Sequence, residues 1–216
     1  MAWTAPNTFV AGAVLTAAQL NTMQANALAG GPIYATEALR DAAIPTPYEG
    51  QRAYITGSTV AAATGGTTSV PTGITTVYNG AAWVCTTEVG AFTSNTGSYA
   101  NPAFTPTLTG SPGTNPSVTV STGTTALVTI SASLTASALM SIQMDVAVSG
   151  ASTIAAGTVS LQGLYWQTSI TSLANVQCAT FILTGLTAGA NTFTINYANN
   201  NSSTYAQRRV IVKGIA

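Results

Sequence analysis

The stretch ALVTISASL, residues 126–134, alternates between apolar and polar side chains along its whole length. Successive side chains of a β-strand point to opposite faces, so a period of two indicates a strand with one buried face. The predicted buried face consists of Ala126, Val128, Ile130, Ala132 and Leu134, and the opposite face is mostly Thr129, Ser131 and Ser133.

The same period recurs downstream, first in LMSIQMDVAV (139–148). Four further runs follow: TVSLQGLYW (158–166), VQCATFIL (176–183), NTFTINY (191–197) and QRRVIVK (207–213). Turn-forming residues separate them, and no helical pattern lies between them. We therefore expect a mainly β chain whose residues 104–216 form an antiparallel β-sandwich of the jelly-roll type.

Charge is nearly absent from this sequence. Five acidic and five basic residues occur among 216, and Asp145 is the single charge between Glu88 and Arg208. Soluble domains ordinarily carry about 25% charged residues. A surface of hydroxyls and amides suits a large permanent assembly. A sandwich of this composition exposes apolar and hydroxyl surface that one copy cannot cover, so we expect a homotrimer.

The same composition argues against several classes of partner. Arg208, Arg209 and Lys213 form the only basic cluster, and polar positions on a terminal strand explain it better than nucleic-acid binding does. No run of 18 apolar residues predicts a membrane span, and the N-terminus lacks the pattern of a secretory signal. Cys85 and Cys178 are read as free, mostly buried thiols, compatible with assembly in a reducing cytoplasm.

Residues 1–87 look like an attachment region. Thr16 and Gln19 fit a capping box, which predicts a helix over about 16–29 with one narrow apolar stripe. Such a helix is marginal alone and needs a partner. The candidate association residues of this region are Trp3, Phe9, Leu20, Met23, Leu28, Tyr78 and Trp83.

A small β module is expected to follow the helix. A short helical segment carries Glu37, Arg40 and Asp41 and ends before two prolines; residues 52–56 alternate like a strand, and 58–73 read as a loop. Asn79-Gly80 predicts a type I′ turn in a hairpin over about 75–85 that brings Tyr78 near Trp83. Residues 88–103, rich in Gly, Ser, Thr and Asn, are expected to be a linker.

The sequence predicts no enzyme. Histidine is absent, which removes the commonest general base and most zinc sites, and no phosphate-binding loop is present, so we assign no catalytic, metal or cofactor residue. The pair Glu37 and Asp41 reads as solvated helix surface, and Asp145 reads as a residue of a polar sheet face or an intersubunit contact. Tyr165 and Trp166 form a candidate glycan contact. The favoured interpretation is that one of the two rings packs in the core and the other lies at a subunit interface.

Several stretches resemble virion proteins of tailed bacteriophages. FVAGAVLTAAQLNTMQANALA (9–29) is similar to the N-terminal opening of phage minor tail and fibre proteins, and ALRDAAIPTPYEGQRAYIT (38–56) followed by VYNGAAWV (77–84) is similar to a small module of such proteins. VTVSTGTTALVTISASL (118–134), LTAGANTFTINY (186–197) and RRVIV (208–212) resemble the jelly-roll knobs that end fibres or decorate heads.

This resemblance implies a non-enzymatic structural protein exposed on the virion, usually a homotrimer. Its N-terminal region would bind other virion proteins, of the tail or the major capsid, and no long shaft is present. A minor tail protein or short fibre is favoured over a capsid decoration or head-fibre protein. A carbohydrate-binding module that contacts a host cell-surface glycan is the alternative from another functional class.

Overall fold

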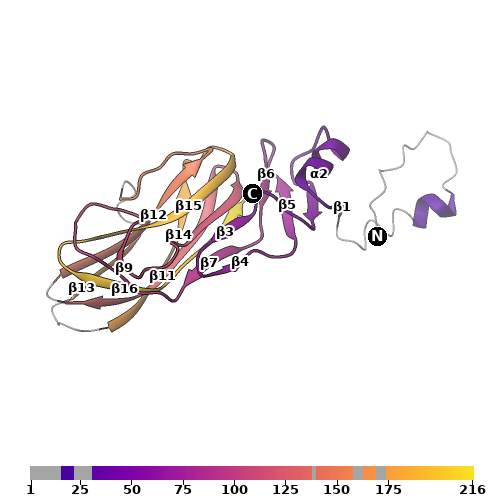
Figure 1. The fold of residues 1–216 in the computed structure, drawn as a ribbon. Coiled ribbons are helices and arrows are strands. Elements are labelled where there is room, and N and C mark those ends of the chain that lie inside the picture. Colours follow the sequence, from indigo (N-terminus) through magenta and orange to yellow (C-terminus); the bar gives the residue numbers. More distant parts are fainter. Residues whose placement is uncertain (1–15, 22–30, 138–139, 158–162, 169–173) are drawn as a thin grey trace.

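The computed structural model of the chain describes residues 16–21, 31–137, 140–157, 163–168 and 174–216. Most of these residues belong to an elongated β-sandwich, and a small sheet with one helix stands at one end of it (Figure 1). The expected mainly β fold with an antiparallel sandwich is confirmed.

The sandwich consists of two sheets. The five-stranded sheet has the order β13 (Leu164–Thr168), β12 (Met140–Gly150), β15 (Gly189–Asn199), β10 (Ser117–Thr122) and β3 (Ala62–Thr64). The seven-stranded sheet has the order β14 (Ala174–Thr184), β11 (Thr125–Ala136), β16 (Ser203–Ile215), β7 (Val89–Thr93) and β4 (Thr67–Ser69), with β8 (Gly97–Tyr99) pairing with β16 and with β9 (Thr109–Gly110).

Strand order identifies the sandwich as a jelly roll. From β10 to β16 the chain changes sheet at every connection except the one between β12 and β13. Pairing neighbours are therefore distant in sequence, as in β10 with β15 and in β11 with β16. This exchange between two antiparallel sheets is the arrangement of a double Greek key.

The core lies between the two sheets and follows the alternation of the sequence. Strand β11 alternates between half-buried and buried positions over its whole length, and its predicted inward residues are at most 1% exposed. Strand β15 contributes Phe193, Ile195 and Tyr197, each fully buried. Burial of one large aliphatic side chain contributes about 1.5–3 kcal/mol, so these rows supply most of the stabilisation of the sandwich.

One β-bulge shifts the phase of the last strand. The pairing of β11 with β16 is irregular between Ser131 and Ser133, and Gln207 has a φ of 49°. Before the bulge Ser203 and Tyr205 point inward, and after it the inward positions are Arg208 and Val210. The extra residue of a bulge reverses the side-chain alternation, so it is the reason that Arg208 enters the core and Arg209 does not.

The small sheet has the order β1 (Ile33–Tyr34), β2 (Arg52–Ile55), β5 (Ile74–Tyr78) and β6 (Trp83–Cys85). Helix α2 (Glu37–Ala43) lies against it. Thr36 caps this helix, because its hydroxyl oxygen accepts the backbone N–H of Leu39 at 3.3 Å. The helix ends at Ala43, and its C-cap Ile44 stands directly before Pro45, which cannot continue the helix.

Two expectations about irregular segments are corrected. Residues 58–73, expected to be a loop, contain β3 and β4, which pair with β10 and β7 of the sandwich. Residues 88–103, expected to be a linker, contain β7 and β8, and both pair with β16. Strands β3, β4 and β8 have 3 residues each, mostly Ala, Thr, Ser and Gly, so their local sequence gives little sign of a strand. Strand β7 carries Val89 and Phe92, but it has only 5 residues.

The hairpin exists, but its turn differs from the prediction. Tyr78 pairs with Trp83, so the connection has four residues, 79–82, rather than two. Gly80 has a φ of 89°, whereas Asn79 is not among the residues with positive φ, which rules out a type I′ turn. Instead, the side-chain oxygen of Asn79 accepts the N–H groups of Ala81 at 3.1 Å and Ala82 at 2.9 Å. Asparagine acts here through its side chain.

The first helix begins as predicted. Residues 17–21 are helical, and the backbone N–H of Gln19 donates to the Thr16 hydroxyl at 3.2 Å, while the N–H of Thr16 donates to Gln19 Oε1 at 2.9 Å. This reciprocal pair is the expected capping box. The rest of the predicted helix lies outside the described residues.

Candidate interaction surfaces

Trp83 lies inside the small module rather than on its surface. Its side chain is 9% exposed, and its ring meets Tyr78 edge to face at 5.6 Å between centroids. On the other side the guanidinium of Arg40 lies 4.5 Å from the centre of the Trp83 ring. Arg40 also forms an ion pair with Asp41 at 2.8 Å, so the positive charge of Arg40 is balanced by a residue of the same helix. This stacking joins α2 to the hairpin.

Glu37 is buried, in contrast to the expected solvated helix surface. Its Oε2 accepts the backbone N–H of Thr59 and the Thr59 hydroxyl, both at 3.0 Å, and its Oε1 accepts the Ser58 hydroxyl. Burial raises the pKa of the Glu37 carboxyl, but the hydrogen bonds from Ser58 and Thr59 together outweigh it and hold the pKa below its ordinary value. The Glu37 carboxylate therefore holds residues 58–59, which precede β3, against helix α2 through these hydrogen bonds.

The small module and the sandwich share one core. Ile55, Ile74 and Cys85 belong to the same buried cluster as the inward residues of the sandwich. The Ser121 hydroxyl donates to the Trp83 carbonyl at 2.6 Å across the junction. A Cβ atom on Gly214 would lie 2.8 Å from the carbonyl oxygen of Cys85, so glycine permits this close approach.

The predicted association residues are placed in different surroundings. Leu20 is 49% exposed on the helical turn 17–21. Tyr78 and Trp83 pack against each other inside the module. The remaining candidates, Trp3, Phe9, Met23 and Leu28, lie outside the described residues. The structure therefore brings together only the hairpin pair.

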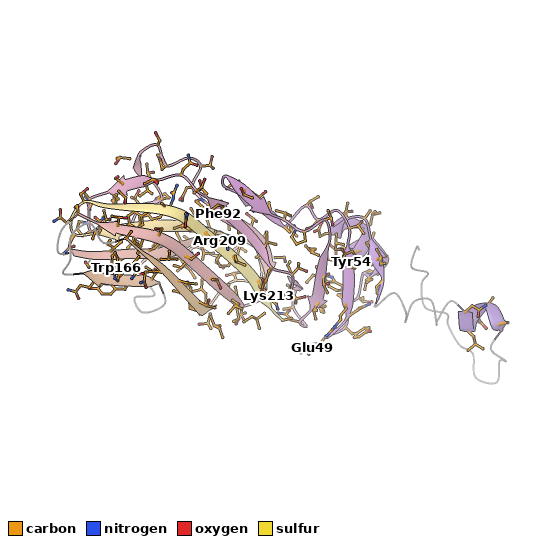
Figure 2. The ribbon with its side chains drawn as sticks, turned by 90° about the horizontal axis from the view of Figure 1, so that it is seen from below. Glu49, Tyr54, Phe92, Trp166, Arg209 and Lys213 are labelled. Atoms are coloured by element: carbon orange, nitrogen blue, oxygen red, sulfur yellow. The ribbon has the colours of Figure 1, made fainter. Side chains whose placement is uncertain are left out.

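The two adjacent aromatics of β13 point in opposite directions. Trp166 packs against the core, at the end of the sandwich farthest from the small sheet (Figure 2), and Tyr165 is 59% exposed. Neighbouring positions on a strand face opposite sides of the sheet, so the pair cannot form one stacking platform. Of the pair, Tyr165 has the exposed ring.

An uncovered apolar surface lies on the outer face of β14, an edge strand of the seven-stranded sheet. Val176 is 68% exposed and Ile182 is 52% exposed, and the exposed thiol of Cys178 lies between them. Among the described residues, β14 pairs only with β11, and its 11 residues include neither a charge nor a proline. Natural edge strands usually carry such protection against pairing with another chain. We call this surface, formed by Val176, Cys178, Thr180 and Ile182, the β14 face.

Only part of the β14 face could be predicted from the sequence. The alternation of residues 176–183 predicted the strand, but not that Ala179 and Phe181 face the core while Val176 and Ile182 face outward. Cys178 was expected to be buried, and it is exposed; Cys85 is buried, and burial raises the pKa of its thiol. The missing charge in this run is the signal that could have identified the face.

Two charged residues are buried that were expected to be at polar surface positions. Arg208 is 1% exposed, and its Nη1 donates to the Tyr197 hydroxyl at 2.9 Å. Asp145 is 5% exposed; its Oδ2 accepts the N–H of Gly157 at 2.7 Å, and burial raises the pKa of its carboxyl. Both are structural groups. Polar atoms of the protein donate to the Asp145 carboxylate and accept from the Arg208 Nη atoms, whereas the buried Nε of Arg208 has no hydrogen-bond partner among the described residues.

The part of the chain that the structure describes contains no cluster of three or more His, Cys, Asp or Glu side chains that could hold a metal ion. Among the same residues, no helix has the length and apolar character needed to cross a membrane.

Comparisons with known proteins reveal no family. No protein-family model and no curated protein matches the chain. Among solved structures, Eiger TNF from S. frugiperda aligns over 60% of this chain and 92% of that chain, at 11% identity and a TM-score of 0.40. The isomalto-dextranase of Arthrobacter globiformis T6 complexed with panose aligns over 60% of this chain but 22% of that chain, at 17% identity and a TM-score of 0.29. Both scores lie below 0.5, so the jelly-roll assignment rests on the strand order of this chain itself.

Proposed function

We propose that this chain is a non-enzymatic structural protein of a tailed-phage virion. Its N-terminal segment attaches to the particle, and its sandwich is exposed outside as a homotrimer. A minor tail protein or short fibre is the favoured form, and a capsid decoration or head-fibre protein is the alternative. The motif resemblance supports the virion setting.

The β14 face is the observation that carries this proposal. Its strand edge lacks the charges, prolines and bulges that keep single domains dispersed, and its exposed Val176 and Ile182 gain stability when they are covered. A permanent assembly covers such a surface continuously, whereas a monomeric enzyme or transient binder would leave it exposed. Self-association through this face suits a protein whose task is structural.

Light scattering of the purified full-length protein tests the association. We expect a mass of three chains, and we expect the double variant Val176→Lys, Ile182→Lys to become a monomer because like charges would meet at the interface. Gln167→Lys, at an exposed position on β13 of the other sheet, is the matched control and should remain trimeric. A wild-type protein that stays monomeric at high concentration would contradict the trimer.

Labelling of intact particles tests the virion role separately. Antibodies raised against the purified protein should bind the surface of the phage that encodes it. A variant without residues 1–30 keeps every described strand and should fold, but it should not be incorporated into particles. Absence of the protein from purified particles would refute the virion role.

Glycan binding for host adhesion is a second candidate, favoured by the exposed ring of Tyr165. Binding of a cell-wall glycan that is lost in Tyr165→Ala and retained in wild type would establish it. Trp166 is half-buried and packs against the core, so the glycan contact would rest on the single ring of Tyr165.

A further inference from the structure

A groove lies at the junction between the small sheet and the sandwich, with a volume of about 540 Å³. Its first wall belongs to the small sheet and includes Arg52, Thr75 and Val77. Its second wall belongs to the seven-stranded sheet and includes Leu127, Lys213 and Ile215. Figure 2 shows Lys213 at the end of the sandwich that faces the small sheet, which carries Tyr54. The shared core makes this junction a fixed part of the fold.

Each wall presents the same combination of side chains. Arg52 pairs with Val77 in the register of β2 and β5, and Lys213 pairs with Leu127 in the register of β16 and β11. Each wall therefore carries one cation beside one aliphatic group. Val77 and Leu127 are half-buried, so they can take up further apolar contact.

The two cations have no acidic partner. The only ion pair among the described residues joins Arg40 to Asp41, and no Asp or Glu side chain lines the groove. Two unpaired positive charges on opposite walls favour a ligand that brings negative charge to both. Apolar contacts beside each charge favour a ligand in which acidic and aliphatic side chains alternate or lie close together.

We infer that this junction groove binds an extended peptide segment of a partner protein that carries both acidic and aliphatic side chains. An extended segment presents alternate side chains to opposite sides, which matches the two walls. Nucleic acid fits less well, because two cations supply little of the counterion release on which its binding depends.

A second copy of this chain is a poorer occupant than another protein. The acids of the chain that are exposed are Asp41, Glu49 and Glu88, and they are separated from one another by at least seven residues of sequence. Asp41 is already paired with Arg40. No short extended segment of this chain therefore offers two carboxylates to the groove. The inference does not depend on the virion role, since it concerns the groove of the isolated protein.

Two synthetic peptides probe the groove: a fluorescein-labelled peptide of alternating Val and Glu, and the same peptide with Gln in place of Glu. Anisotropy titrations with the full-length protein should show binding of the acidic peptide that weakens with added salt, and at least about tenfold weaker binding of the amide peptide. The double variant Arg52→Gln, Lys213→Gln should lose at least about tenfold in affinity for the acidic peptide.

Arg209→Gln is the matched control. Arg209 is an exposed cation of the same sheet, but it lies over the Phe92 ring at 5.1 Å and does not line the groove. This variant should bind the acidic peptide within about twofold of wild type. The charge-reversed variant Arg52→Glu, Lys213→Glu should bind a peptide of alternating Val and Lys instead, which shows that the fold and groove remain intact.

Three results would overturn the inference. Equal binding of the acidic and amide peptides would remove the role of charge. A loss in Arg209→Gln as large as in the double variant would place the ligand elsewhere on the sheet. Self-association that disappears in the double variant, with no peptide binding in wild type, would make a second copy the occupant. The trimer test uses the β14 face and other variants, so each proposal can fail alone.

Discussion

Arg208 donates a hydrogen bond of 2.9 Å from its Nη1 to the Tyr197 hydroxyl in the interior of the sandwich. Arg208 belongs to β16 and Tyr197 to β15, so this bond joins the two sheets across the core. The Tyr197 hydroxyl in turn donates to Asn115 Oδ1 at 2.6 Å, and Asn115 Nδ2 donates to the carbonyl of Ile195 at 2.8 Å. Burial raises the pKa of Tyr197 to about 12, although the Arg208 guanidinium opposes this shift, so the hydroxyl remains a donor at neutral pH.

Replacement of Arg208 by methionine should lower stability measurably. The Arg208 guanidinium also donates to the carbonyl oxygens of Pro112 and, at 3.5 Å, Asn95, and these partly buried acceptors would lose their donor. We expect Arg208→Met to lower the free energy of unfolding by about 1–3 kcal/mol. Arg209→Met is the control, because Arg209 is exposed, and it should change stability by about 0.5 kcal/mol or less. Urea unfolding measures both; equal losses would contradict a structural role for the buried cation.

The bulge at Gln207 gives a second prediction. Its φ of 49° lies in the left-handed region, where glycine is relaxed and a β-branched residue is strained. We expect Gln207→Gly to leave stability unchanged or raise it by up to about 1 kcal/mol, and Gln207→Val to lower it by more than about 1 kcal/mol. Thermal unfolding separates the two. A valine variant as stable as the glycine variant would show that the bulge relaxes freely.

Long strands could be predicted from the sequence, whereas the short strands β3 and β4 could not. The long strand β11 buries one complete face of large residues, so its alternation was sufficient to predict it. Strands β3 and β4 have 3 residues each. They form because each pairs with the edge of a longer strand, β3 with β10 and β4 with β7. Those edges come from distant parts of the chain and leave no local signal.

The candidate sites were harder to predict because burial of charge depends on register. A strand over 203–215 without a bulge would place Tyr205 and Arg209 on one face, whereas the irregularity at Gln207 exchanges Arg209 for Arg208. Nothing in the run QRRVIVK marks the position of that bulge. Similarly, Glu37 is buried because a segment 21 residues later folds back to donate to it.

Glu37 predicts a specific dependence of stability on pH. Its folded pKa lies below the ordinary value of 4.5, so its carboxylate stabilises the fold above about pH 4.5 and loses this contribution as the pH falls through the lower folded value. Glu37→Gln should cost about 1–3 kcal/mol at pH 7, because one Gln oxygen cannot accept all of the donors on Ser58 and Thr59. The difference from wild type should shrink below pH 4.5.

Denaturant unfolding at a series of pH values measures this difference. Glu49→Gln is the control, since Glu49 is exposed, and it should follow the wild-type curve. A deficit of Glu37→Gln that stayed constant down to the acid transition would contradict a role for the charged carboxylate.

The contact between Gly214 and the hairpin gives the last prediction. A Cβ atom at position 214 would lie 2.5 Å from Val84 Cγ1 and 2.8 Å from the Cys85 carbonyl oxygen, and the second of these is backbone that cannot rotate away. Gly214→Ala should therefore push β6 from the end of the sandwich and cost about 1–3 kcal/mol. Hydrogen exchange should then accelerate in β5 and β6, which form the hairpin, while the amides of β12 and β15 keep their protection. Loss of protection throughout the sandwich would show instead that the small module and the sandwich unfold as one cooperative unit, as their shared core permits.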